Sequence, residues 1–341
     1  MSLLRIDKLT MRFGGLVAVD AVTLEIAPNE IVSLIGPNGA GKTTVFNAVT
    51  GIYEPTAGKI IFNDHETRRE FTGKTALAFL LIGLITAFAT VFLINIESVW
   101  ETAITGNYTY RQAFPWLKAV ASVFASLTGH MILPSLIGFI IGSAGAFSVW
   151  QRSRRAPEIA ARAGIARTFQ NIRLFNQMTV LDNVLLGMDS QLRTRFWHAA
   201  LRLPLYWRER DDAAGKALET LRFVGLEQQA GQLAENLAYG HQRRLEIARA
   251  LAMNPKIILL DEPAAGLNPA ESRALMELIH RIRERNITVL LIEHDMQVVM
   301  NISDRIAVLD YGKKIAEGSP AEVRANPAVI EAYLGKSDAN A

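Results

Sequence analysis

Short apolar runs alternate with glycine-rich turns at the start of the chain and predict the beginning of an α/β protein. Residues 3–9 and 22–26 have strand length and flank a Gly-Gly pair, so they predict an antiparallel β lobe. Residues 30–36 predict a buried strand that ends in glycine, and residues 42–50 predict a helix. A phosphate-binding loop requires this order of strand, loop and helix.

Two later stretches stay apolar for much longer than an amphipathic helix does. Residues 75–96 lack charge over 22 positions, and residues 119–150 lack it over 32. About 20 apolar residues cross a bilayer as a helix. The second stretch contains His130 and Pro134, so its span is placed near residues 131–150, where small residues permit close helix packing: Gly138, Gly142 and Gly145. The alternative is a buried hairpin, although soluble helices seldom lack a polar face for so long.

Composition excludes several functional classes. A chain of 341 residues, half of them hydrophobic, is long enough for two domains or for one domain with an insertion. The net charge of +3 is too small to indicate nucleic-acid binding without a clustered basic face. The absence of cysteine excludes disulfides, thiolate metal sites and thiol catalysis. Charges within the first eight residues interrupt the apolar run of an export signal, so none is expected.

The glycine-rich loop after the buried strand fits the pattern G-x-x-x-x-G-K-[ST]. Its glycines let backbone N–H groups turn inward around phosphate oxygens at a helix N-terminus. Lys42 is expected to reach the β and γ phosphates, and the Thr43 hydroxyl is expected to bind Mg²⁺. We therefore expect ATP to bind along the whole loop: Gly36, Pro37, Asn38, Gly39, Ala40, Gly41, Lys42, Thr43 and Thr44.

Two further apolar strands end in residues that suit phosphoryl transfer. The run KIILLDEP is a short apolar strand followed by two adjacent carboxylates, Asp261 and Glu262. Their side chains alternate, so one can serve a metal while the other faces an attacking water. The run TVLLIEH ends in His294, and a histidine at a strand end is by itself more often structural. Its position one helix and one strand after Asp261 changes that interpretation, because parallel strands end at one edge. There it could donate to a γ-phosphate.

Five motifs in this order resemble those of an ABC-type ATP-binding subunit: GPNGAGKTT, the glutamine of RTFQN, LAYGHQRRLEIARAL, ILLDEP with AGLNP, and IEHD. LAYG in place of the commoner LSGG, RTFQNIRLF, DEPAAGLNP and the ending NPAVIEAYLG are similar to the ATP-binding subunits of bacterial branched-chain amino acid importers. The similarity covers about residues 1–67 and 155–336.

The resemblance assigns roles to individual residues. It implies that Glu262 is the general base, that His294 holds the γ-phosphate, and that Gln170 contacts Mg²⁺ or water and relays to the membrane partner. It also implies that Phe13 stacks on adenine. The implied catalytic set is Glu262, His294, Gln170 and Lys42, and the implied metal set is Thr43, Gln170 and Asp261.

The resemblance also implies a dimer, because the signature at residues 237–241 acts on the ATP of a second subunit through Ala238 and Gly240. Ala238 occupies the usual serine position, so backbone N–H groups and the following helix dipole replace a hydroxyl. Tyr239 and His241 replace a glycine and a glutamine, and Asn268 replaces the usual aspartate. These departures bear on the strength of the coupling between subunits.

Basic residues follow the signature and also lie in an aromatic segment that precedes it in the chain. Glu246 is three positions after Arg243 and offers it a local partner, so solvated or phosphate-facing arginines are favoured over a nucleic-acid patch: Arg243, Arg244 and Arg249. Residues 193–210 mix aromatics with arginines. Docking on a membrane subunit, or packing of a helical subdomain, is favoured there over RNA binding.

The predicted fold class is α/β: a P-loop ATPase core of the ABC type with an N-terminal antiparallel β lobe, a helical subdomain at residues 171–253 and an inserted two-helix apolar hairpin. The predicted division is residues 1–67 for the first part of the core, 68–154 for the hairpin and 155–341 for the remainder.

Flanking charges predict the orientation of the hairpin. Basic residues precede the first span and follow the second: Arg68, Arg69, Lys74, Arg152, Arg154 and Arg155. Charges between the spans cancel: Glu97, Glu101, Arg111 and Lys118. The positive-inside rule then places both ends in the cytoplasm and residues 97–118 outside. Aromatic residues are expected at the outer interface: Trp100, Tyr108, Tyr110 and Trp116.

The function expected from motifs and resemblance is an ATP-binding and ATP-hydrolysing subunit that powers a membrane importer for branched-chain amino acids. Its expected place is the cytoplasmic face of the inner membrane, anchored by the insertion. Expected partners are a second ATP-binding subunit, integral membrane permeases and, indirectly, a solute-binding protein, with no nucleic acid. The alternative is a dimeric ABC-type ATPase that acts on nucleic acid or ribosomes and uses the insertion as an interaction hairpin.

Overall fold

The computed structural model of the chain describes residues 2–68, 71–101, 116–125, 132–152, 156–191, 201 and 204–334. The chain divides into two compact units. The first consists of Met1–Thr67 with Arg155–Ala341, and the second of Arg68–Arg154.

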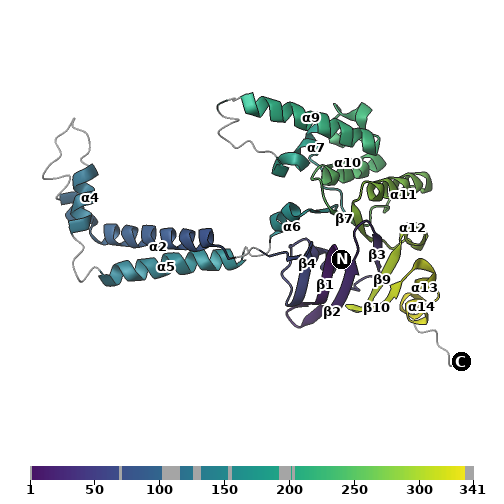
Figure 1. Ribbon diagram of the computed structural model, residues 1–341, viewed down its shortest axis with the longest axis horizontal. Coiled ribbons are helices and arrows are strands. Elements are labelled where there is room, and N and C mark those ends of the chain that lie inside the picture. Colours follow the sequence, from purple (N-terminus) through teal and green to yellow (C-terminus); the bar gives the residue numbers. More distant parts are fainter. Residues whose placement is uncertain are drawn as a thin grey trace. The chain divides into compact units, whose positions relative to one another are not determined.

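A four-stranded antiparallel sheet forms the N-terminal part of the first unit, in the order β2, β1, β4, β5 (Figure 1). Gly14 and Gly15 form the turn between the first two strands, and the backbone φ of Gly14 is 58°. Leu4 and Ile6 are buried while Arg5 between them is exposed, as a half-buried strand requires. This confirms the predicted β lobe, with these strands: β1 (Leu4–Phe13), β2 (Leu16–Ile26), β4 (Ala57–Phe62) and β5 (His65–Glu66).

A six-stranded sheet forms the centre of the same unit, in the order β10, β9, β3, β8, β7, β6. All its neighbouring strands are parallel except β10, which pairs antiparallel with β9 at one edge. Every residue of β3, β7 and β8 is buried, which explains their continuous apolar runs. The strands are β3 (Ile31–Ile35), β6 (Ile165–Arg167), β7 (Ile257–Asp261), β8 (Thr288–Ile292), β9 (Arg305–Asp310) and β10 (Lys313–Gly318).

The order of the central strands brings the candidate chemistry to one edge of the sheet. β8 pairs in parallel with both β3 and β7. The carboxyl end of β3 leads into the glycine-rich loop and α1 (Lys42–Val49), β7 ends at Asp261, and Glu293 and His294 follow β8. Ligands of open α/β sheets bind at such carboxyl ends.

Helices of the first unit continue the α/β core and pack beside it. Among the described residues of the range 171–253, where a helical subdomain was predicted, three helices occur and α10 packs against the other two: α7 (Val180–Met188), α9 (Pro204–Val224) and α10 (Tyr239–Leu251). The same range contains short 3₁₀ turns at Asp189–Gln191, Glu227–Gln229 and Ala234–Asn236. Other helices in the described part of this unit are α6 (Pro157–Ala163), α11 (Pro269–Glu284), α12 (Met296–Ile302), α13 (Pro320–Arg324) and α14 (Pro327–Leu334).

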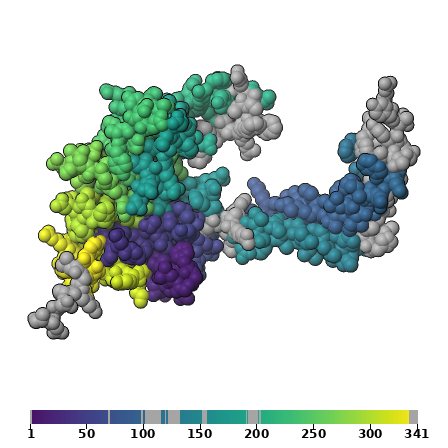
Figure 2. Space-filling view, turned by 180° about the vertical axis from the view of Figure 1, so that it is seen from behind, coloured from purple at the N-terminus to yellow at the C-terminus, as the bar shows by residue number. Residues whose placement is uncertain are grey.

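The second unit is built on two long apolar helices, α2 (Gly73–Ile94) and α5 (Ile132–Arg152), which lie side by side (Figures 1 and 2). The shorter helices α3 (Ile96–Trp100) and α4 (Trp116–Ala125) lie between them in the chain. Within the described part of the chain, two helices are long and apolar enough to cross a membrane, Gly73–Ile94 and Ile132–Gln151. Two apolar helices were predicted, and each lies within three residues of the predicted span.

Candidate nucleotide-binding and hydrolysis site

Glycines shape the loop between β3 and α1. Gly36, Gly39 and Gly41 have backbone φ values of 151°, 83° and 99°, a region that side chains rarely adopt. A Cβ on Gly36 would overlap the carbonyl oxygen of Leu309, and a Cβ on Gly41 would lie 2.6 Å from that of Ala18. Neighbouring backbone therefore excludes a side chain at two of the glycines in the predicted pattern.

Lys42 is the first residue of α1, directly after this loop. Its Nζ donates to the carbonyl oxygens of Gly36 at 2.8 Å and Pro37 at 2.9 Å. Burial lowers the pKa of Lys42, while the negative charges of Glu262 and Asp261 act in the opposite direction. The loop therefore presents a largely buried cation to the carboxylate edge of the sheet, where the anionic phosphates of a nucleotide would be attracted.

Asp261 is held by an arginine that sequence reasoning missed. Arg167 ends β6, and its Nη2 donates to Asp261 Oδ2 at 2.7 Å, with the two side chains 7% and 4% exposed. Arg167 Nη1 also donates to Asn47 Oδ1 at 2.6 Å, which ties β6 to α1. One carboxylate oxygen of Asp261 is thus fixed by a charge-assisted hydrogen bond. The only sequence signal was the position of Arg167 three residues before Gln170.

Glu262, Gln170 and His294 come together from three segments of the chain. Gln170 Nε2 donates to Glu262 Oε2 at 2.9 Å, and His294 Nδ1 lies 3.7 Å from the same oxygen. Glu262 has a positive backbone φ of 47°, a sparsely populated conformation for a side-chain-bearing residue, and its N–H donates to Ile292 O. The turn after β7 therefore directs Glu262 toward two other residues of the predicted catalytic set.

A second carboxylate, that of Glu293, directly precedes His294 in the chain and was also missed. It is 1% exposed, and its oxygens accept the backbone N–H groups of Ala264 at 2.8 Å and His294 at 3.2 Å. Burial raises the pKa of Glu293, and these hydrogen bonds act against that rise. Glu293 therefore links the turn after β7 to the backbone of His294.

The signature residues begin α10. Ala238 is the N-cap and provides no side-chain hydrogen bond to the helix. A Cβ on Gly240 would lie 2.8 Å from Glu271 Oε1, so this glycine allows α11 to approach. Tyr239 donates its hydroxyl to Ala265 O at 3.2 Å, which connects the signature to the segment after Glu262.

The prediction that the arginines of α10 are solvated or face phosphate is wrong for Arg243. This side chain is 1% exposed and pairs at 3.1 Å with Glu246, which is equally buried. Glu246 was the predicted partner of Arg243, but the burial of this ion pair could not be predicted from the spacing of the two residues. Arg249 is half-buried, and burial lowers its pKa. Its guanidinium lies 5.8 Å from the ring centroid of Phe175.

Phe13 ends β1 at the tip of the β1–β2 hairpin. Its side chain is 43% exposed, and its ring meets that of Tyr53 edge-on with centroids 5.2 Å apart. An exposed ring supported by a second aromatic is suited to stacking, so the assignment to adenine stays a prediction. Residues 193–210, predicted to dock or pack, lie mostly outside the described residues.

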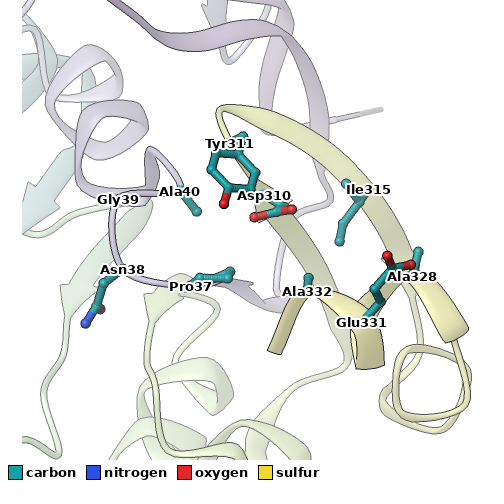
Figure 3. A pocket seen from close by; sticks show the side chains of 10 residues that line it. All are labelled: Pro37, Asn38, Gly39, Ala40, Asp310, Tyr311, Ile315, Ala328, Glu331 and Ala332. Atoms are coloured by element: carbon teal, nitrogen blue, oxygen red, sulfur yellow. The ribbon is translucent and has the colours of Figure 1, made fainter. Parts of the chain in front are cut away.

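A pocket of about 670 Å³ adjoins the phosphate loop. Figure 3 shows Pro37, Asn38, Gly39 and Ala40 on one side of it and residues of α14 on the other, including Glu331. Burial raises the pKa of Tyr333 on α14, and the Gly36 backbone acts against that rise. The C-terminal helix therefore adjoins the nucleotide loop.

Together, a phosphate loop, a carboxylate strand, a glutamine segment and a signature helix on this fold define a P-loop ATPase of the cassette class. The family model described as "ABC transporter" matches residues 19–127 and 131–265, and one described as "Branched-chain amino acid ATP-binding cassette transporter" matches residues 313–339. The chain therefore belongs to the ABC transporter family, and it is an ATP-binding subunit with ATPase activity.

Curated relatives align over almost the whole chain. The high-affinity branched-chain amino acid transport ATP-binding protein LivG of Escherichia coli strain K12 is 40% identical, over 98% of both chains. The corresponding protein BraF of Pseudomonas aeruginosa is 38% identical, again over 98% of both chains.

Solved structures agree in fold. A nucleotide-free ATP-binding cassette of an ABC transporter superposes with a TM-score of 0.64 at 23% identity, covering 98% of this chain and all of that one. A dimeric cassette bound to ADP and Pi superposes with a TM-score of 0.57 at 21% identity, covering 93% of this chain and 98% of that one.

Proposed function

We propose that this chain is the ATP-hydrolysing subunit of a bacterial importer of branched-chain amino acids and that it holds itself in the membrane with its own hairpin. The convergence of Gln170 and His294 on one oxygen of Glu262, beside Lys42 of the phosphate loop, carries the catalytic part. The similarity to LivG and BraF over almost the whole chain supports the solute class.

The chain's own residues divide the hydrolytic work. Lys42 binds the β and γ phosphates, Glu262 accepts a proton from the attacking water, and His294 donates to the γ-phosphate. Gln170 holds the Glu262 carboxylate through their 2.9 Å hydrogen bond and orients it toward that water. Phe13 stacks on the adenine.

Mg²⁺ fits the donors at this edge, because Thr43 lies in the first turn of α1 with an exposed side chain and Asp261 offers a carboxylate held by Arg167. Hydroxyl and carboxylate oxygens are the ligands that Mg²⁺ prefers. Thr43, Asp261 and Gln170 would hold the ion, and the bound ion would neutralise charge on the phosphates.

The working assembly is a dimer of ATP-binding subunits on integral membrane permeases. The signature at Ala238 and Gly240 acts on the ATP of the partner subunit through backbone N–H groups and the N-terminus of α10. The dimeric cassette among the structures of similar fold supports this arrangement. A solute-binding protein acts indirectly, through the permeases.

Purification of the tagged chain from native membranes tests this function against the nucleic-acid alternative. We expect integral membrane permeases in stoichiometric amounts after a mild detergent wash. Nuclease treatment serves as the control, because it should leave the complex unchanged. Recovery of ribosomes or RNA in place of permeases would contradict the proposed importer.

The membrane part of the proposal rests on how α2 and α5 contact one another. Thr86 Oγ1 lies 2.8 Å from Gly138 O across the interface and 2.9 Å from two carbonyl oxygens of its own helix, so these three acceptors share its one hydrogen. Ser143 Oγ donates across the interface to Phe79 O at 3.3 Å. A Cβ on Gly142 would collide with the Thr86 hydroxyl. Small residues and hydroxyl-to-backbone hydrogen bonds are what hold helices together in lipid.

The outward surfaces of this helix pair are apolar and exposed. Exposed side chains on the two helices include Leu77, Leu80, Leu81, Leu84, Ile85, Phe88, Leu133, Leu136, Ile137, Ile140, Ile141 and Phe147. In water, so large an apolar surface would be a liability, whereas acyl chains would cover it. The hydroxyl groups of Thr86 and Ser143 lie at the contact between α2 and α5, so the surfaces that would face lipid are apolar.

Charge gives the proposed orientation. Arg68 and Lys74 lie at the start of the hairpin, and the segment between the long helices carries charges of both signs, including Glu97 and Lys118. Both ends of the hairpin are therefore cytoplasmic, as an ATPase requires. Other residues used for this orientation lie outside the described residues: Arg69, Arg154, Arg155, Arg111, Tyr108 and Tyr110.

Because the chain lacks cysteine, single introduced thiols test this topology. In cells with a permeabilised outer membrane, an impermeant maleimide should label Asn107→Cys between the two spans. The matched control Glu158→Cys, exposed in α6, should react only after the inner membrane is opened. Protection of the residue 107 thiol until lysis, or a soluble protein in cells that lack permeases, would contradict the anchor.

A further inference from the structure

The ion pair of Arg243 and Glu246 on α10 is buried but is not used by the mechanism above. Both side chains are 1% exposed, and Arg243 Nη1 lies 3.1 Å from Glu246 Oε2. Burying two charges costs more than their attraction returns unless further hydrogen bonds satisfy them. The remaining contacts of the pair therefore indicate what it does.

Those contacts go to the backbone on both sides of Gln170. Arg243 donates to Phe169 O at 2.8 Å and to Gln170 O at 2.9 Å. Glu246 Oε1 accepts the N–H of Phe169 at 3.1 Å and that of Arg173 at 3.5 Å. The pair thus presents donors to two carbonyl oxygens and acceptors to two amides. These four hydrogen bonds can form only when the backbone of residues 169–173 has one particular position relative to α10.

The same arginine also contacts the signature. Arg243 Nη2 lies 3.3 Å from the hydroxyl of Tyr239, which donates to Ala265 O at 3.2 Å. Ala265 N–H donates to the carbonyl oxygen of Glu262 at 3.2 Å. The network therefore connects the first residue of α10 to both the Gln170 backbone and the turn that carries Glu262.

We propose that Arg243 and Glu246 are positioning residues that hold the backbone of Gln170 and so set its 2.9 Å contact with Glu262, linking the signature end of α10 to the subunit's own hydrolysis site. The inference rests on the proposed roles of Gln170 and Glu262. Because the signature acts on the partner subunit's ATP, the link couples the two sites of the dimer.

Three variants separate this role from a structural one. Glu246→Ala removes the acceptor for both amides, whereas Glu246→Gln keeps a carbonyl oxygen that can accept them. The exchange Arg243→Glu with Glu246→Arg keeps the ion pair but turns a carboxylate toward carbonyls and a guanidinium toward amides. The matched control is the same exchange at the exposed pair Arg222 and Glu227, which should have little effect.

In the full-length protein in lipid nanodiscs we expect Glu246→Ala to bind an ATP analogue within about twofold of wild type. Its hydrolysis should fall by roughly 10- to 100-fold, because small displacements of catalytic groups cost that much. The Hill coefficient for ATP should fall toward 1. Amide hydrogen exchange should accelerate at residues 169 and 173 but not at residues 247–250. Glu246→Gln should retain more activity than Glu246→Ala.

Two outcomes would overturn the proposal. One is rescue of hydrolysis by the charge exchange, which would show that only the ion pair matters. The other is an equal loss of hydrolysis in Glu246→Ala and Glu246→Gln with amide hydrogen exchange at residues 169 and 173 unchanged. This second result decides the question even if the charge-exchanged double variant does not fold. Glu262→Gln, run in parallel, tests the underlying function: full hydrolysis there would refute the site assignment itself.

Discussion

Replacing Arg167 should destabilise the ATPase unit, because the buried carboxylate of Asp261 then lacks its ion-pair partner. Arg167→Met keeps an unbranched side chain but removes the guanidinium, whose carbon lies 5.6 Å and 5.2 Å from the ring centroids of Phe46 and Phe169. It removes the 2.7 Å hydrogen bond to Asp261, which is only 3% exposed. The variant therefore leaves a buried carboxylate without its main partner.

The expected magnitude follows from that burial. Removing one member of a buried ion pair costs about 3–5 kcal/mol, because the other charge stays uncompensated. Lys42 interacts electrostatically with Asp261 and offsets part of the loss, so we expect the lower end, about 3 kcal/mol. For a unit of this size, that corresponds to a fall in Tm of roughly 6–12 °C.

Thermal unfolding of the detergent-solubilised full chain, followed by far-UV circular dichroism, measures the effect. Asp261→Asn in the Arg167→Met background removes the uncompensated charge, so the double variant should recover much of the lost Tm. Arg222→Met, which breaks an exposed pair with Glu227, is the control and should shift Tm little. A Tm for Arg167→Met equal to that of the control would refute the reasoning.

Three further predictions concern the site. Glu262→Gln should bind ATP normally and lose on the order of 10²-fold or more in turnover, measured as phosphate release; near-normal turnover would exclude Glu262 as the base. Lys42→Ala should abolish tight binding of a fluorescent ATP analogue, while His294→Ala should keep binding and lose hydrolysis; equal loss of binding in both would contradict their separate roles. Burial raises the pKa of Glu293, so native stability should fall as pH rises from its unfolded pKa of about 4.3 through the raised folded-state value. The free energy of unfolding of Glu293→Gln, measured with denaturant, should lack this fall with pH. If it changed with pH in parallel with that of the wild type, the raised pKa of Glu293 would be contradicted.

Local patterns predicted the elements that depend on local chemistry. The Gly-x₄-Gly-Lys-Thr spacing identified the phosphate loop, in which Gly36 and Gly41 have positive backbone φ angles that favour glycine. Continuous apolar runs identified β3, β7 and β8, because both faces of these strands are buried. Charge-free length identified both helices of the hairpin. Each of these signals is contained in one short segment.

Contacts between distant segments could not be predicted in the same way. Arg167 is 94 residues from Asp261, and spacing along the chain gives no sign of their hydrogen bond. Arg243 was expected to be solvated or to face phosphate because Glu246 offered it a local partner, and its burial arises where α10 meets the Gln170 segment. Glu293 was overlooked beside the more prominent His294, although it is the more buried of the two.

Uptake of radiolabelled leucine by cells that lack the endogenous copy of this chain tests the central claim most directly. The wild-type chain should restore uptake, while Glu262→Gln, made at the same level and recovered in the same membrane fraction, should not. Uptake that persists without the chain, or that Glu262→Gln restores as well as wild type does, would contradict an ATP-driven importer subunit for these amino acids.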